Sequence, residues 1–139
     1  MNESVKVTQY SMFIDGEWKQ STSENMIKVI NPATEEIFAT VPKASREEVK
    51  EAIDGAKTAQ PKWEDLSPLQ RSSYLFKIAE LIEQDRERLA RILTLEQGKP
   101  LYESRSEVSG SATNFRYYAE FARRIEGDIL PSDFPGNRS

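Results

Sequence analysis

The stretch Leu95-Glu96-Gln97-Gly98-Lys99-Pro100 divides the longest helical pattern of the chain into two halves. Gly98 can adopt the left-handed conformation at a helix end, and Pro100 cannot continue that helix but can start a new one. Apolar residues on both sides recur at spacings of three, four and seven, the pattern of an amphipathic helix. They are Leu75, Ile78, Ala79, Ile82, Leu89, Ile92 and Leu93 before the break, and Leu101, Val108, Ala112, Phe115, Ala119, Ala122 and Ile125 after it. These residues predict a helical core that turns at Gly98.

Two capping boxes mark where earlier helices begin. Residues 45–48 (Ser-Arg-Glu-Glu) predict a helix that ends near Pro61, with Trp63 in a connector beyond it. Residues 67–70 (Ser-Pro-Leu-Gln) predict a second start, and Asp85 can cap a further start, so we expect a break at residues 84–86. The last helix is expected from about residue 100 to residue 125, with Gly127 stopping it.

The first third of the chain has the pattern of short strands. Asp15-Gly16 between two β-prone runs predicts a two-residue hairpin. Residues 26–30 and 36–41 predict two further strands, joined by turn residues at Asn31-Pro32. Residues 1–9 are polar and unpatterned, which predicts a loose N-terminal arm. The chain is therefore expected to be α+β, with short antiparallel strands followed by a layer of three to four helices.

Composition excludes several classes of function. With 139 residues and a net charge of −4, the chain has a single domain's length and lacks the basic surface that nucleic acid requires. No run of eighteen apolar residues is present, and the first residues lack the apolar stretch of a signal peptide, so we expect no membrane partner and a cytoplasmic location. The chain has no cysteine and no histidine, which excludes disulfides and Cys or His nucleophiles.

Four stretches together resemble the N-terminal part of the aldehyde dehydrogenase superfamily. They are Phe13-Ile14-Asp15-Gly16-Glu17-Trp18, Val29-Ile30-Asn31-Pro32-Ala33-Thr34-Glu35-Glu36, Leu95-Glu96-Gln97-Gly98-Lys99-Pro100 and Tyr117-Tyr118-Ala119-Glu120-Phe121-Ala122. The resemblance extends from Tyr10 to the end, so residues 10–139 are interpreted as the first section of a cofactor-binding domain of α/β fold. Residues 122–127 and 132–136 make the sequence similar to the lactaldehyde and glycolaldehyde dehydrogenases, with other small-aldehyde or semialdehyde oxidisers as the alternative.

The resemblance implies an enzyme whose catalytic residues lie beyond this chain. The family oxidises aldehydes to acids with NAD or NADP, using a cysteine nucleophile, a glutamate base and an asparagine amide, and no catalytic residue is expected here. The six glycines are too far apart for a dinucleotide-binding loop, so no cofactor is expected on this chain. The expected partners are the rest of the same enzyme chain and further copies of it in a homo-oligomer. The alternative is a stand-alone helical interaction module without catalysis.

The resemblance also implies one candidate metal site. Some family members bind a monovalent cation through backbone carbonyls that match Val29 and Ile30 and an acidic residue that matches Glu96. Carbonyl and carboxylate oxygens are suitable ligands for a hard cation. The alternative interpretation is that Glu96 caps or pairs at a helix end. Trp18 and Trp63 are interpreted as core anchors, and at least one of Tyr117 and Tyr118 should lie at a surface.

Overall fold

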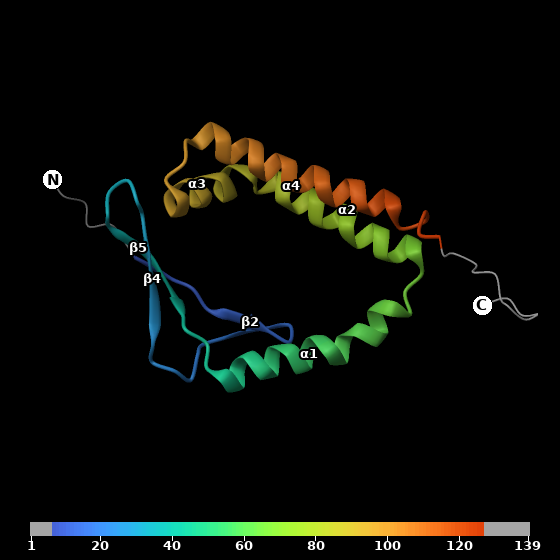
Figure 1. Ribbon diagram of the computed structural model, residues 1–139, viewed down its shortest axis with the longest axis horizontal. Coiled ribbons are helices and arrows are strands. Elements are labelled where there is room, and N and C mark those ends of the chain that lie inside the picture. The colour runs from blue at the N-terminus through green and yellow to red at the C-terminus, as the bar shows by residue number, and fades with distance from the viewer. Residues whose placement is uncertain (1–6, 127–139) are drawn as a thin grey trace, which may run out of the picture.

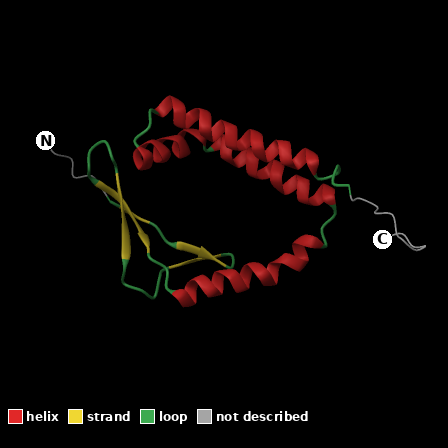
Figure 2. Cartoon of the chain, viewed as in Figure 1, coloured by secondary structure: helices red, strands yellow, loops and turns green. Residues whose placement is uncertain are grey.

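The computed structural model describes residues 7–126, which form short strands followed by helices (Figure 1, Figure 2). The strands are β1 (Thr8–Gln9), β2 (Met12–Ile14), β3 (Glu17–Lys19), β4 (Met26–Ile30) and β5 (Ile37–Pro42). The helices are α1 (Arg46–Glu64), α2 (Pro68–Gln84), α3 (Arg86–Gln97) and α4 (Leu101–Phe121). The prediction of an α+β chain with short strands and a helical layer is confirmed.

The elements are arranged as an open ring. Figure 1 shows α2 and α4 side by side along one edge, α1 along the opposite edge, and the strands joining them at one end. α4 packs along both α2 and α3, α1 contacts β2, and α3 contacts β4. At the other end, the connector at residues 65–67 joins α1 to α2.

The strands form two small sheets. β2 and β3 pair antiparallel as a hairpin whose turn residues, Asp15 and Gly16, have φ of 53° and 80°, which confirms the predicted two-residue turn. The second sheet has the order β1-β5-β4, with β4 and β5 antiparallel. β1 pairs with β5 in parallel, so the expectation of antiparallel strands alone is wrong here. The expected loose arm over residues 1–9 is likewise corrected, because Thr8 and Gln9 belong to β1; residues 1–6 lie outside the described range.

Both helix starts with capping boxes are confirmed. Ser45 and Ser67 each accept a hydrogen bond from the third helical amide, and the residue there accepts one in return from the cap amide. The break after Gln84 is also confirmed. Its mechanism differs from the prediction, because the Asp85 carboxylate makes no cap bond and instead accepts hydrogen bonds from Arg88 Nε at 2.8 and 2.9 Å.

Two predicted helix ends were wrong. α1 continues through Pro61 to Glu64, so Trp63 lies within the helix and not in a connector. Its ring packs against Tyr74 of α2 with 5.5 Å between ring centroids, which holds the last turn of α1 in place. α4 ends at Phe121, before the predicted residue 125, and the stop expected at Gly127 lies outside the described residues.

The helical core is built from small side chains. The fully or nearly buried residues of α2, α3 and α4 are Ser72, Ala79, Ala90, Ser104, Val108, Ala112 and Ala119. Small residues let the helices approach closely, and the buried Ser72 hydroxyl donates to the carbonyl of Ala119 at 2.8 Å. The two tryptophans are not core anchors in this part of the chain, since Trp18 is 72% and Trp63 42% exposed. Tyr117 and Tyr118 are both exposed.

The described helices are too short or too polar to span a membrane. Between residues 7 and 126, none of the helices combines the length and the apolar character that crossing a bilayer requires.

Candidate functional site

The turn between β4 and β5 is held by its own first residue. The side-chain oxygen of Asn31 accepts from the amide of Ala33 at 3.0 Å, and its carbonyl accepts from the amide of Glu35 at 2.8 Å. The Asn31 amide donates to the carbonyl of Glu36 at 2.9 Å, which closes the loop. These bonds fix the position of Pro32 at the tip of the sheet, as the turn chemistry of the sequence predicts.

Gly98 lies directly against this turn. Its φ is +73°, and its amide donates to the carbonyl of Thr94 at 2.8 Å, so the predicted left-handed end of α3 is confirmed. A Cβ atom built on Gly98 would lie 2.7 Å from Cγ of Pro32, far inside the normal carbon contact distance. The Asn-Pro turn and the Gly-Lys-Pro turn, two of the stretches that carried the resemblance, therefore form one junction.

The three residues of the candidate cation site lie on the two sides of this junction. Val29 and Ile30 end β4, and the register of β4 with β5 shifts between these two residues. Glu96 lies in the last turn of α3, which contacts β4. The structure thus brings together the elements that carry Val29, Ile30 and Glu96. The cation site itself stays a prediction.

The Glu96 side chain also borders a second feature. It lines a shallow groove between α3 and α4 whose other walls are mainly apolar, including Leu93, Val108 and Phe115. The neighbouring Lys99 forms an ion pair with Glu107, one of the residues that line this groove, and no hydrogen bond from Lys99 to the carbonyls at the end of α3 is found within residues 7–126. Within residues 7–126, Glu96 has no ion pair within 4.0 Å, so the alternative of a helix-end pair is not observed in this range.

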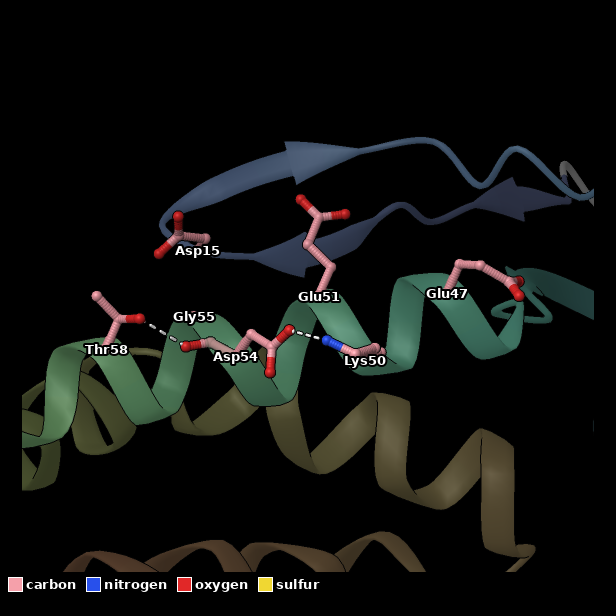
Figure 3. A pocket seen from close by; sticks show the side chains of 7 residues that line it. All are labelled: Asp15, Glu47, Lys50, Glu51, Asp54, Gly55 and Thr58. Carbon is pink, nitrogen blue, oxygen red and sulfur yellow. Dashed lines mark hydrogen bonds and ion pairs between the residues drawn. The ribbon is translucent and has the colours of Figure 1, made fainter.

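A hollow of about 440 Å³ lies between α1 and the hairpin turn, and it is rich in carboxylates (Figure 3). Asp15 approaches it from the hairpin, while Glu47, Glu51 and Asp54 project from α1. Lys50 pairs with Asp54, and Lys19 Nζ lies 2.6 Å from Glu51, so two of these carboxylates are already neutralised. The residues 7–126 contain no cluster of three or more His, Cys, Asp or Glu with metal-binding geometry.

Glu48 is the carboxylate with the most unusual surroundings. Its Oε1 accepts from the amide of Thr22 at 2.6 Å, and its Oε2 accepts from the amide of Ser45 at 2.7 Å. The hydroxyls of Ser21 and Thr22 donate to it as well. The amides of Ser45 and Thr22 lower the pKa of Glu48 to about 2, against the opposing effect of burial. The capping box in the sequence identified Glu48, but its bonds to residues 21 and 22 were missed because they join distant segments.

The described residues do not fit a dinucleotide. A phosphate usually binds at free amides of a helix N-terminus that follows a glycine-rich loop. The N-terminus of α1 is occupied by the Glu48 carboxylate and that of α2 by Ser67 and Gln70. The starts of α3 and α4 have no side-chain cap, but they follow Asp85 and Gly98-Lys99-Pro100 and not a glycine-rich loop.

Comparison with known proteins identifies the family. The profile of the aldehyde dehydrogenase family matches residues 18–139. Glutarate-semialdehyde dehydrogenase of Pseudomonas putida is 41% identical over 91% of this chain, and D-glyceraldehyde dehydrogenase (NADP(+)) of Picrophilus torridus is 41% identical over 86%. The crystal structure of lactaldehyde dehydrogenase from Escherichia coli superimposes with a TM-score of 0.90 and 38% identity over 95% of this chain. The chain belongs to the aldehyde dehydrogenase family.

The match covers only part of each relative. The aligned region is 26% of the Pseudomonas putida protein, 24% of the Picrophilus torridus protein and 28% of the Escherichia coli structure. The chain therefore spans about a quarter of the length of the proteins it matches.

Proposed function

We propose that this chain is the N-terminal section of an NAD(P)-dependent aldehyde dehydrogenase that oxidises a small aldehyde, of the lactaldehyde or glycolaldehyde type, to its carboxylic acid. The observation that carries the proposal is the superposition on the Escherichia coli lactaldehyde dehydrogenase over 95% of the chain. The similarity to D-glyceraldehyde dehydrogenase also supports a small hydroxyaldehyde, and the similarity to glutarate-semialdehyde dehydrogenase supports a semialdehyde with a carboxylate group as the alternative substrate. The name of the Picrophilus torridus relative supports NADP as one choice of cofactor, with NAD as the other.

In this proposal the chain contributes structure and the rest of the enzyme contributes the chemistry. The sequence has no cysteine, so the thiolate that the family uses must come from another segment. No glycine-rich loop precedes a helix within residues 7–126, so in this proposal the cofactor is also held elsewhere. We propose that the chain's partners are the remainder of the same enzyme and further copies of it, in the cytoplasm.

Exposed apolar faces support this proposal over a stand-alone interaction module. Val49 and Ile53 of α1 are 48% and 61% exposed, and Phe13 of the hairpin is 61% exposed. A self-sufficient module is expected to bury most such side chains or to gather them in one patch. Here they are spread over α1, α2, α4 and the hairpin, as expected for surfaces that further protein covers.

The isolated 139-residue chain should not oxidise aldehydes. We expect no reduction of NAD⁺ or NADP⁺, measured by absorbance at about 340 nm, with glycolaldehyde, lactaldehyde or glutarate semialdehyde, because no nucleophile of the required kind is present. A longer polypeptide that continues through the reading frame after Ser139 is the positive control. Turnover by the pure short chain would refute the assignment of all catalysis to other segments. A stop codon directly after Ser139, with a short chain that binds no apolar dye, would instead favour the interaction module.

The isolated chain should also self-associate. β4 is an edge strand of its sheet, and Ile27 and Ile30 on it are about half exposed, so unpaired backbone groups lie beside apolar surface. If two copies paired their β4 edges or exchanged their N-terminal strands, the backbone groups would gain hydrogen-bond partners and the apolar surface would be covered. Light scattering is expected to give a mass that rises above 15.9 kDa with concentration. A constant monomer mass, with rapid hydrogen exchange in the strands, would show that the N-terminal region frays instead.

A further inference from the structure

The contact between Pro32 and Gly98 joins two bodies that otherwise meet mainly where α1 leads into α2 and Trp63 packs on Tyr74. One body, the strand layer, comprises β1, β4, β5 and the hairpin with α1 against it; the other, the bundle, comprises α2, α3 and α4. The main contact between them is that of α3 with β4, at the Pro32–Gly98 junction. Figure 1 shows α3 near the strands β4 and β5 with no chain segment joining them directly, whereas at the opposite end the chain itself runs from α1 to α2.

The opposite end has the features of a hinge. The connector of residues 65–67 joins the two bodies covalently, and the cap amide of Asp65 still donates to the carbonyl of Pro61 at 3.0 Å. Arg71 at the start of α2 donates from Nη1 to the carbonyls of Glu64 and Leu66, at 2.9 and 2.5 Å. These bonds and the Trp63–Tyr74 contact hold the end of α1 to the start of α2. The bodies therefore stay joined at this end and can move only by a change of backbone angles about it.

The junction depends on the absence of a side chain at Gly98. The backbone φ of +73° directs a Cβ atom at that position to within 2.7 Å of Pro32 Cγ. Pro32 cannot easily move away from Gly98, because hydrogen bonds fix the turn that contains it. The Asn31 side chain accepts from the amide of Ala33, and the Asn31 carbonyl accepts from the amide of Glu35. Two rigid turns therefore approach each other closely here, and a single carbon added at Gly98 requires one of them to shift.

We propose that the Pro32–Gly98 contact is a latch that holds the strand layer against the helical bundle, and that the chain opens about the connector at residues 65–67 when the latch is broken. The latch sets where the end of β4 lies relative to the end of α3. Any ligand that takes groups from both sides of the junction depends on it. The proposal concerns the isolated chain, before other segments cover its exposed faces, and does not depend on which aldehyde the enzyme oxidises.

The test separates the steric contact from backbone strain. Gly98→Asn adds a Cβ atom, but asparagine tolerates positive φ, so the change acts mainly through the collision with Pro32. Because the chain has no cysteine, spin labels can be placed at Lys28→Cys in β4 and Thr113→Cys in α4 without background. The labelled chain is diluted into an excess of unlabelled chain, so that association through β4 adds no distances between copies. We expect one narrow distance distribution with glycine at 98 and a broad distribution at longer distances with asparagine. Pro32→Ala removes Cγ and is expected to restore the narrow distribution in the Gly98→Asn protein.

A second label pair shows whether the bundle itself remains folded. Lys77→Cys in α2 with Thr113→Cys in α4 lies within the bundle, and its distance should not change in the Gly98→Asn protein. An unchanged Lys28–Thr113 distance in that protein would overturn the latch. So would a longer distance that Pro32→Ala does not shorten, since the collision would then not be the cause. A change in the Lys77–Thr113 pair would also overturn it, because the contact would then belong to one cooperative core.

Discussion

Gly98→Val lowers the free energy of unfolding by about 3 kcal/mol or more, a larger loss than most single substitutions cause. A β-branched residue at a φ of +73° costs about 1–3 kcal/mol in backbone strain. The added side chain must also displace Pro32, whose Cγ would lie 2.7 Å from the new Cβ. Both penalties act in the folded state only, so they subtract directly from stability.

Gly110→Val is the matched control for this prediction. Gly110 lies within α4, and a Cβ atom built on it meets nothing within 4 Å. Valine has a higher helix propensity than glycine, so this substitution should leave stability unchanged or raise it by a few tenths of a kcal/mol. Urea unfolding followed by circular dichroism measures both variants. Equal midpoints for Gly98→Val and Gly110→Val would show that neither the conformation nor the close approach at Gly98 matters.

Local signals in the sequence predicted the parts of the fold that local chemistry determines. The serine caps at Ser45 and Ser67, the Asp15-Gly16 turn and the end of α3 at Gly98 each use residues that lie close together in the chain. The parallel pairing of Thr8 with Ala39 has no such local signal, and it was missed. Long-range pairing depends on which edge is available after the other elements have folded.

The errors at α1 and at the tryptophans also have physical causes. Proline disfavours a helix interior, yet α1 passes through Pro61 because Trp63 packs on Tyr74 and the Asp65 amide still bonds to the Pro61 carbonyl. Trp18 was expected in a core, but within residues 7–126 it packs against Phe13 at 5.1 Å and is 72% exposed. An apolar side chain is buried only where another element covers it. The residue type alone does not tell whether such an element is present.

The two segments that carry the candidate cation site were predicted separately, and the fold brings their elements into contact. The resemblance supplied Val29, Ile30 and Glu96, and the turn residues predicted the shapes of their two segments. That Pro32 and Gly98 meet could not be derived from either segment alone, because the contact depends on how α3 is placed against β4. The same holds for Glu48, whose partners at Ser21 and Thr22 come from a loop before β4.

Glu48→Gln is expected to lower the melting temperature substantially, on the order of 5 °C or more. Capping boxes ordinarily accept glutamine at this position. At Glu48, however, each oxygen accepts from a backbone amide, Oε1 from Thr22 and Oε2 from Ser45. A glutamine must turn its NH₂ group toward one of these amides, so two donors face each other and one amide loses its partner in a buried position.

The second capping box provides the control for Glu48→Gln. Gln70 occupies the same position in α2, where its Oε1 accepts only from the Ser67 amide, at 2.9 Å, at an exposed site. Gln70→Glu should therefore leave the melting temperature unchanged or raise it slightly, because a negative charge is favourable at a helix N-terminus. Equal effects of the two substitutions, measured by thermal unfolding at neutral pH, would show that the bonds to residues 21 and 22 do not stabilise the fold.

The effect of Glu48→Gln should also depend on pH, with a sign that its hydrogen bonds determine. The pKa of Glu48 is lowered from 4.5 to about 2, mainly by the amides of Ser45 and Thr22. A carboxylate with a lowered pKa stabilises the folded state above its unfolded pKa, and this contribution is lost as the pH falls through the folded pKa. The difference in melting temperature between the unsubstituted chain and Glu48→Gln should therefore be constant above pH 5 and shrink from about pH 4.5 to pH 2.

Glu83, Asp85 and Glu87 also have lowered pKa values, through Arg116, Arg88 and Arg105, but they are common to both proteins and cancel in the difference. A difference that grows on acidification would mean that the Glu48 carboxylate is protonated more readily in the folded chain than in the unfolded chain, which is incompatible with four donors bound to an anion.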